Sequence, residues 1–237
     1  MITLESRIVY RGRIVLKTGL HIGSGRGNSS TDSAVVKGQD GEPYIPGSSL
    51  KGIIRSHLER ILPSMGYNCC GLYKESQVNC LSVKKDLETK LKEIRESIDS
   101  EQAIIEFLNG NLCDTCKLFG SRFSASKVKI TDGMILHTGF PPEIRDGVAI
   151  DRDSGTTAEG AKYDYEVVPA GSVFDFEMIA ENLTNDEKEA INVAIEELKG
   201  GFIFLGGNTS RGLGKILLTD VQILEKDFTN QGGNDNA

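Results

Sequence analysis

The order of the periodic segments along this chain is the feature that most constrains its fold. Strand-like patterns, rich in β-branched residues, occupy residues 7–22, 127–136, 172–180 and 202–224, the last interrupted by a glycine-rich loop. Helical patterns occupy residues 50–62 and 184–198. The order strand, helix, strand, strand, helix, strand is the split βαβ arrangement. The sequence therefore predicts an α+β fold with a ferredoxin-like (RRM-like) antiparallel sheet and both helices on one face.

Local signals support the two helices. In the first, Ser48 is a candidate N-cap ahead of an apolar stripe. In the second, Thr184 and Glu187 have the spacing of a capping box, and Gly200 and Gly201 follow the last apolar residue. The apolar positions of the two stripes are Leu50, Ile54, Leu58 and Ile61, and Ile191, Ala194, Ile195 and Leu198.

Two segments interrupt this core. Residues 67–116 are predicted to be an insertion with cysteines at its edges and one polar helix in its middle, marked by Leu87, Leu91, Ile94 and Ile98. Residues 140–170, rich in Gly, Asp and Thr, are predicted to form a protruding hairpin. We expect a single domain over residues 1–228 and a disordered tail over residues 229–237.

Charge and hydropathy restrict the possible partners. The 237 residues carry a net charge of −7, which argues weakly against a nucleic-acid binder, yet residues 1–60 hold nine basic against five acidic residues. Residues 116–130 hold four basic residues and no acidic one, so one face is expected to be basic. No apolar run approaches the roughly 18 residues of a membrane span, and the first residues lack the apolar stretch of a signal peptide. A cytoplasmic location is expected.

The cysteines are the strongest chemical signal. All five fall within 48 residues, and an odd number in a chain expected in the cytosol suits a metal site better than disulfides. Cys113 and Cys116 form a CxxC pair, and Cys70 and Cys80 can complete a four-thiolate zinc site, which would be structural because it has no open position for water. Two alternative ligands remain, Cys69 and His57.

Three other features are weak when taken alone. The loop GGNTSRGLG (206–214) offers backbone N–H groups and Arg211 to an anion, but it lacks the Lys of a P-loop. The start of the first helix, with Lys51 and Arg55, suits a phosphate by dipole and charge. Asp32, at the end of a Gly/Ser-rich loop, is by itself a turn residue. No GxSxG elbow occurs, and three histidines give little support to histidine-driven nuclease chemistry.

Taken in order, these segments resemble the RAMP proteins, the repeat-associated RNA-binding family of CRISPR effector complexes. The hallmark is GEPYIPGSSLKGIIR (41–55), and the Gly-rich loop with Asp32 lies upstream of it. CKLFGS (116–121) resembles the family's LFG element, residues 148–174 resemble its thumb hairpin, and GGNTSRGLGKI (206–216) resembles its glycine-rich loop. The most similar group is the repeated backbone subunit of type III complexes, the third subunit of the Csm-type assembly or its counterpart in a related subtype.

The resemblance implies a function. Copies of such a subunit stack along a guide RNA beside other type III subunits, and each thumb displaces a base pair of the guide–target duplex. The residue matching Asp32 is required for target-RNA cleavage, whose products resemble those of transesterification assisted by a divalent ion, expected here to be Mg²⁺. We assign guide-RNA binding to the basic or loop residues of the matching segments: Ser48, Ser49, Lys51, Arg55, Arg122, Gly207 and Arg211.

Two alternatives stay open. The chain can be a non-catalytic RNA-binding subunit of the same kind of complex, and only Asp32 separates this reading from the endoribonuclease. It can also be a zinc-stabilised ferredoxin-like protein that binds no nucleic acid, which suits the acidic net charge but leaves the co-occurring segments unexplained.

Overall fold

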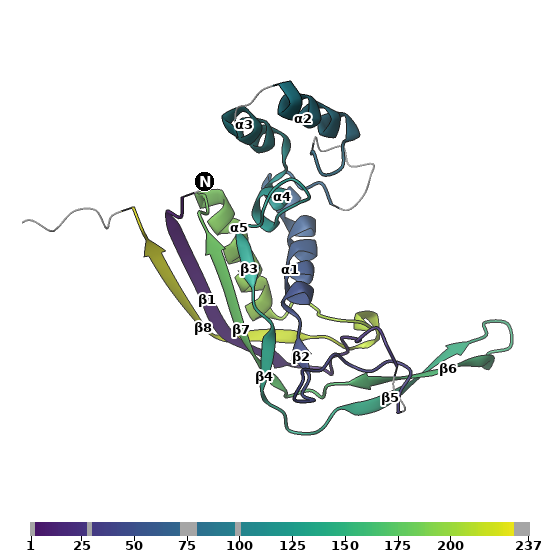
Figure 1. Cartoon of the computed structure of the whole chain (residues 1–237). Helices are drawn as coiled ribbons and strands as arrows, with labels where there is room; N and C mark the ends of the chain where they lie inside the picture. The colour runs from purple at the N-terminus through teal and green to yellow at the C-terminus, as the bar shows by residue number, and fades with distance from the viewer. Residues whose placement is uncertain (1–2, 28–29, 72–79, 98–100, 230–237) are drawn as a thin grey trace, which may run out of the picture.

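The computed structural model (Figure 1) describes residues 3–27, 30–71, 80–97 and 101–229. An antiparallel sheet with the strand order β2-β4-β7-β1-β8 forms its centre, and β3 also pairs with β7. The long strands are β1 (Ser6–Leu16), β7 (Val173–Glu181) and β8 (Ile216–Asp227), and the short ones are β2 (Tyr44–Ile45), β3 (Val128–Ile130) and β4 (Gly133–His137). The fold is therefore a mixed α+β fold with an antiparallel sheet, as predicted.

Burial along the strands follows their side-chain period of two. Strand β7 alternates strictly between buried and half-buried positions, because only one face of the sheet is covered. Two strand predictions need correction. Residues 127–136 form two strands instead of one, and residues 202–207 make only an isolated bridge between Phe204 and Lys215. The chain turns at Gly206, whose φ is +82°, and cannot continue as a strand there.

Helices α1 (Gly47–Ile61) and α5 (Asn185–Gly200) pack together against the sheet (Figure 1). The capping box of α5 is confirmed, with both of its hydrogen bonds present, and Gly201 ends the helix at a φ of +70°. The predicted apolar stripes are buried in one continuous core, apart from Ile61 at the end of α1. The two helices thus have the positions that their periodicity predicts.

The predicted N-cap of α1 is wrong. Pro46 occupies the N-cap position, no side chain caps the helix, and Ser48 lies inside the first turn. Instead, the backbone N–H of Gly47 donates to Oδ1 of Asp132, at 2.7 Å. A Cβ atom at position 47 would lie 2.4 Å from the carbonyl oxygen of Ile130, so the close approach of the β3–β4 connection requires glycine here. Asp132 lies 85 residues away, so no local pattern could reveal this contact.

The insertion contains more helices than the sequence pattern suggested. In place of one polar helix the structure has α2 (Lys85–Ser97), α3 (Glu101–Asn111) and the short α4 (Asp114–Phe119). Leu87 and Leu91 are buried as predicted, whereas Ile98 lies outside the described residues. Helix α3 was missed although Ile104, Phe107 and Leu108 repeat at helical spacing. These three residues pack against the same apolar cluster as α2.

The segment 140–170 contains a two-stranded hairpin formed by β5 (Glu143–Ile150) and β6 (Thr157–Val167), which projects away from the sheet (Figure 1). We call it the thumb. It lies at the opposite end of the molecule from α2 and α3. The predicted disordered tail lies outside the described residues apart from Thr229. Among the described helices none is long and apolar enough to cross a membrane, and the cytoplasmic location stays a prediction.

Candidate metal centre and nucleic-acid interface

Four cysteines come together where helix α4 begins. The sulfur atoms of Cys70, Cys80, Cys113 and Cys116 all lie within 4.8 Å of one another, and all four residues are buried. The Sγ atoms of Cys70 and Cys116 are 3.6 Å apart, close to the ~3.8 Å that four Zn–S bonds of about 2.3 Å require in a tetrahedron. This cluster can hold a zinc ion, and its four thiolates would leave no open position for water.

Polar donors surround the sulfur atoms. The backbone N–H of Cys113 donates to Sγ of Cys80 at 3.4 Å, and Oγ of Ser82 lies 3.3 Å from Sγ of Cys116. The guanidinium of Arg55 donates to the same Cys116 sulfur at 3.4 Å. Such donors favour the thiolate form that a metal needs.

Hydrogen bonding within the cluster separates the pKa values of its thiols. The contact with Cys113 holds the pKa of Cys80 well below its usual range and raises the pKa of Cys70 above it. The contact with Cys116 lowers the pKa of Cys113 to about 6. A metal binds the thiolate forms, so a divalent ion would displace the protons that remain on the cluster.

The two alternative ligands lie outside this group of four. Cys69 packs against the main core, and burial raises the pKa of its thiol to about 11, which disfavours the thiolate. His57 is engaged elsewhere, with Nε2 2.8 Å from Oε2 of Glu197 on α5. The described residues therefore place the predicted ligands together and leave both substitutes outside.

Arg55 connects this cluster to helix α1. Besides its bond to Cys116, the guanidinium donates to the carbonyl oxygen of Gly120 at 2.9 Å and to Glu59 at 2.8 Å. Three of its five N–H groups are used in this way. The guide-RNA contact assigned to Arg55 stays a prediction, and the structure adds a structural role that the sequence did not indicate.

The start of α1 is only partly open to an anion. The Asp132 carboxylate already accepts from Gly47, so a phosphate would meet a negative charge at the first turn. Lys51 is half-buried one turn into the helix, and burial together with repulsion from Arg55 lowers its pKa. Ser48 is exposed and Ser49 is half-buried beside it. Their RNA contacts stay predictions.

Arg122 and the glycine-rich loop lie apart from each other. The Arg122 side chain is 69% exposed, near Glu88 on the insertion. In the loop, Gly207 donates its backbone N–H to the carbonyl oxygen of His21 at 2.8 Å, so this donor is already used. The Arg211 guanidinium contacts the hydroxyl of Tyr163 at the base of the thumb. The glycine-rich loop is thus packed against the thumb.

Asp32 also lies at the base of the thumb. Its backbone N–H donates to Oδ1 of Asp164 at 2.8 Å, and the backbone N–H of Asp164 donates to Oδ2 of Asp32 at 3.1 Å. Asp32 is exposed, and its Oδ1 has no hydrogen-bond partner within the part of the chain that the structure describes. The carboxylate is held at one oxygen and open at the other, which suits a group that must meet a ligand.

A buried polar network supports the same loop. Nδ1–H of His21 donates to the carbonyl oxygen of Glu166 at 2.7 Å, and the hydroxyl of Ser33 lies 3.3 Å from Nε2. The Glu166 carboxylate accepts from the backbone of Val35 at 3.0 Å and from Lys37 at 2.7 Å. The Gly/Ser-rich loop is therefore held against the thumb by the residues that follow Asp32.

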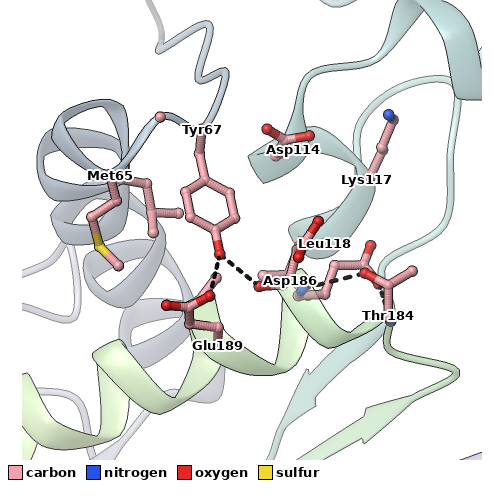
Figure 2. Close-up of a pocket in the computed structure, with 12 residues that line it drawn as sticks. Met65, Tyr67, Asp114, Lys117, Leu118, Thr184, Asp186 and Glu189 are labelled. Atoms are coloured by element: carbon pink, nitrogen blue, oxygen red, sulfur yellow. Dashed lines mark hydrogen bonds between the residues drawn. The ribbon is translucent and has the colours of Figure 1, made fainter.

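A separate pocket lies away from both of these sites. A cavity of about 540 Å³ opens between the end of α1, helix α4 and the start of α5 (Figure 2). The Tyr67 side chain points toward α5, and its hydroxyl lies 3.1 Å from the carbonyl oxygen of Asp186 and 3.3 Å from Oε2 of Glu189 (Figure 2). Its rim carries four carboxylates and Lys117, and none of the residues predicted to bind RNA or a metal lines it.

Comparison with known proteins decides the family. A family model described as RAMP superfamily matches residues 13–216. These residues include the Asp32 loop, α1, the insertion, the thumb and the whole glycine-rich loop. The chain belongs to the RAMP superfamily.

Several RAMP relatives carry one name, "CRISPR system Cms endoribonuclease Csm3". The protein from Methanocaldococcus jannaschii is 31% identical to this chain over 250 aligned residues, covering 100% of the chain and 88% of the relative. That from Methanothermobacter thermautotrophicus is 28% identical, covering 94% and 87%, and that from Streptococcus thermophilus is 27% identical, covering 89% and 86%. The similarity therefore spans nearly the whole chain and includes the cysteine-rich insertion in the first case.

Sequence reasoning missed four residues around the Asp32 loop and the base of the thumb: His21, Tyr163, Asp164 and Glu166. The alternation of KYDYE predicts a strand, but the contact between Asp32 and Asp164 spans 132 residues. No local pattern relates the two. A short polar run at the base of a predicted hairpin is the one signal that could have pointed to them.

Proposed function

We propose that this RAMP chain is the backbone subunit of a type III CRISPR ribonucleoprotein, which binds guide RNA and cleaves complementary target RNA at regular intervals. The observation that carries this proposal is the full-length similarity to relatives named as Csm3 endoribonucleases. The position of Asp32 supports it, because the carboxylate is exposed beside the thumb. Copies of this chain, other type III subunits and the two RNAs are the proposed partners.

The architecture suits this role. The strand order β3-β7-β1-β8 with two helices on one face supports a ferredoxin-like core in a single domain. The thumb projects from that core and could separate a base pair of a guide–target duplex (Figure 1). The zinc ion, held by Cys70, Cys80, Cys113 and Cys116, would fasten the insertion to the core without taking part in the chemistry.

The proposed chemistry needs little from the protein. A splayed nucleotide can bring its 2′-oxygen into line with the leaving 5′-oxygen, so positioning supplies much of the rate. The open Oδ1 of Asp32 would orient the 2′-hydroxyl or hold a divalent cation. Such a cation, proposed to be Mg²⁺, would supply charge neutralisation at the scissile phosphate.

The test is a reconstituted complex incubated with labelled complementary RNA and Mg²⁺. Regularly spaced fragments are expected. Tight target binding without fragments would favour the non-catalytic subunit. A chain that purifies without nucleic acid, seen in its absorbance ratio, and that joins no complex with guide RNA would contradict the proposal and favour the zinc-stabilised protein unrelated to RNA.

Lys51→Glu is expected to weaken guide-RNA binding with little dependence on RNA sequence. Each lost phosphate contact should reduce the slope of log Kd against log salt by about one unit. The measurement is RNA affinity across a salt series. Lys92→Glu, an equal charge change on the exposed face of α2, is the control and should leave the slope unchanged. Equal slopes for Lys51→Glu and the unmodified chain would contradict the placement of RNA at α1.

A further inference from the structure

The contact between Asp32 and Asp164 is reciprocal. Each residue donates its backbone N–H to the other's carboxylate, at 2.8 Å and 3.1 Å. Two such bonds fix both the distance and the rotation of the Asp32 backbone relative to strand β6. A single bond would fix only the distance. Asp164 lies within β6, so the Asp32 loop takes its position from the thumb.

We propose that Asp164 is a positioning residue that sets the place of the Asp32 carboxylate for target-RNA cleavage. The inference rests on the proposed function, because it assumes that Asp32 acts on the RNA. It adds that the thumb is part of the cleavage machinery through a direct contact, in addition to any role in separating bases.

The neighbouring residues of β6 hold the rest of the loop, and among the side chains that the structure describes it is Asp164 that bonds to Asp32. Ser33 forms a parallel bridge with Tyr165, and the backbone N–H of Glu166 donates to the carbonyl oxygen of Ser33 at 2.9 Å. These contacts begin one residue after Asp32. On the N-terminal side, a Cβ atom at Gly27 would lie 2.8 Å from the carbonyl oxygen of Asp32, so the loop folds closely over itself.

The chemistry makes this position critical. An exposed carboxylate on a loop has many rotamers and backbone positions, and a displacement of about 1 Å at a reacting group can cost about a hundredfold in rate. Supporting hydrogen bonds are the means by which such a group is held within about 0.5 Å of its working position. The hydrogen bond from the Thr31 hydroxyl lowers the pKa of Asp164, so it stays an ionised acceptor for the Asp32 N–H.

Three variants in the assembled complex separate positioning from charge. Asp164→Ala removes the acceptor and the charge, whereas Asp164→Asn keeps an acceptor oxygen for the Asp32 N–H and removes only the charge. The control is Asp146→Ala, because Asp146 is the cross-strand partner of Asp164 on β5, is exposed, and forms its ion pair with Lys162 of the thumb. The measurements are target Kd and the single-turnover cleavage rate of bound RNA.

We expect Asp164→Ala to lower the cleavage rate of bound RNA about tenfold or more while target Kd changes by less than about twofold. Asp164→Asn should restore the rate to within about threefold of the unmodified complex. Asp146→Ala should not differ from it. A rate for Asp164→Ala equal to that of the control would overturn the proposal. A rate for Asp164→Asn as low as that of Asp164→Ala would also overturn it. The negative charge of Asp164, and not the hydrogen bond that positions Asp32, would then account for the loss of rate.

Amide hydrogen exchange in the full chain gives a readout that needs no activity. Asp164→Ala should speed exchange at the Asp32 amide about tenfold, whereas Asp164→Asn and Asp146→Ala should not. If the unmodified complex binds target RNA but cleaves none, the proposed function fails, and exchange still decides whether Asp164 holds the loop. Unchanged exchange at Asp32 in Asp164→Ala would refute the positioning role whatever the activity.

Discussion

Replacing Asp32 by alanine is expected to lower target-RNA cleavage by at least about a hundredfold, the usual loss when a group that orients or deprotonates a nucleophile is removed. Guide binding, assembly and target affinity should stay unchanged, because the side chain is exposed and its removal leaves no cavity. The measurement is the rate at which regularly spaced fragments of labelled complementary RNA appear with Mg²⁺. Chelation of divalent ions should have the same effect as the substitution.

The Asp32 side chain also makes a hydrogen bond, so Asp32→Ala has to be compared with a second variant. Oδ2 of Asp32 accepts from the backbone of Asp164, so alanine removes a hydrogen bond together with the charge. Asp32→Asn keeps an acceptor at that position and should be nearly as inactive, because the amide neither carries a charge nor binds a divalent ion well. Asp40→Asn, an exposed acid in the following turn, is the control for charge alone.

The outcomes separate the possible roles of Asp32. Cleavage by both Asp32 variants would dismiss it as the catalytic residue. Cleavage by Asp32→Asn alone would mean that the side chain only holds the loop against the thumb. Loss of target binding in either variant would show a structural role that the exposed position does not predict.

Much of the fold follows from local signals. The capping box and apolar stripe of α5 act within one helix, so their sequence pattern was sufficient. The strand β7 likewise follows from the alternation of its apolar residues. The N-cap of α1 did not follow, because the group that accepts from its first N–H is Asp132, on a different element.

The two candidate sites differ in the same way. The four cysteines could be assigned because thiolate chemistry limits the ligands to a few residues whatever the fold. The surroundings of Asp32 could not be assigned, because Asp164 and Glu166 meet its loop only through contacts that span more than 130 residues. Arg55 illustrates the intermediate case: its charge suggested RNA, while its position directs three donors into the protein.

Replacing Cys113 by serine is expected to abolish zinc binding and to lower stability. A structural zinc site contributes its binding energy directly to folding, so the loss of one ligand removes a large part of that energy. A loss of about 3 kcal/mol would lower the Tm of a chain of this size by roughly 6–12 °C. Elemental analysis of freshly purified protein should find one zinc ion per unmodified chain and none in the variant.

Neighbouring cysteines provide a matched pair of variants. Cys70→Ser removes a member of the cluster and should lose the metal, whereas Cys69→Ser changes a thiol packed against the main core and should keep it. Zinc retained in Cys70→Ser and lost in Cys69→Ser would mean that Cys69 is the ligand. An unmodified chain purified without zinc would rule out the site.

The effect of zinc loss should extend beyond the insertion. Arg55 joins helix α1 to the Cys116 sulfur and to the Gly120 carbonyl that follows α4, so release of α4 would leave a half-buried guanidinium without two of its acceptors. Lys51 lies one helical turn before Arg55 on the same face. We therefore expect Cys113→Ser to weaken guide-RNA binding as well, with a salt slope like that of Lys51→Glu. Unchanged RNA affinity in a zinc-free variant would show that the insertion and α1 are energetically independent.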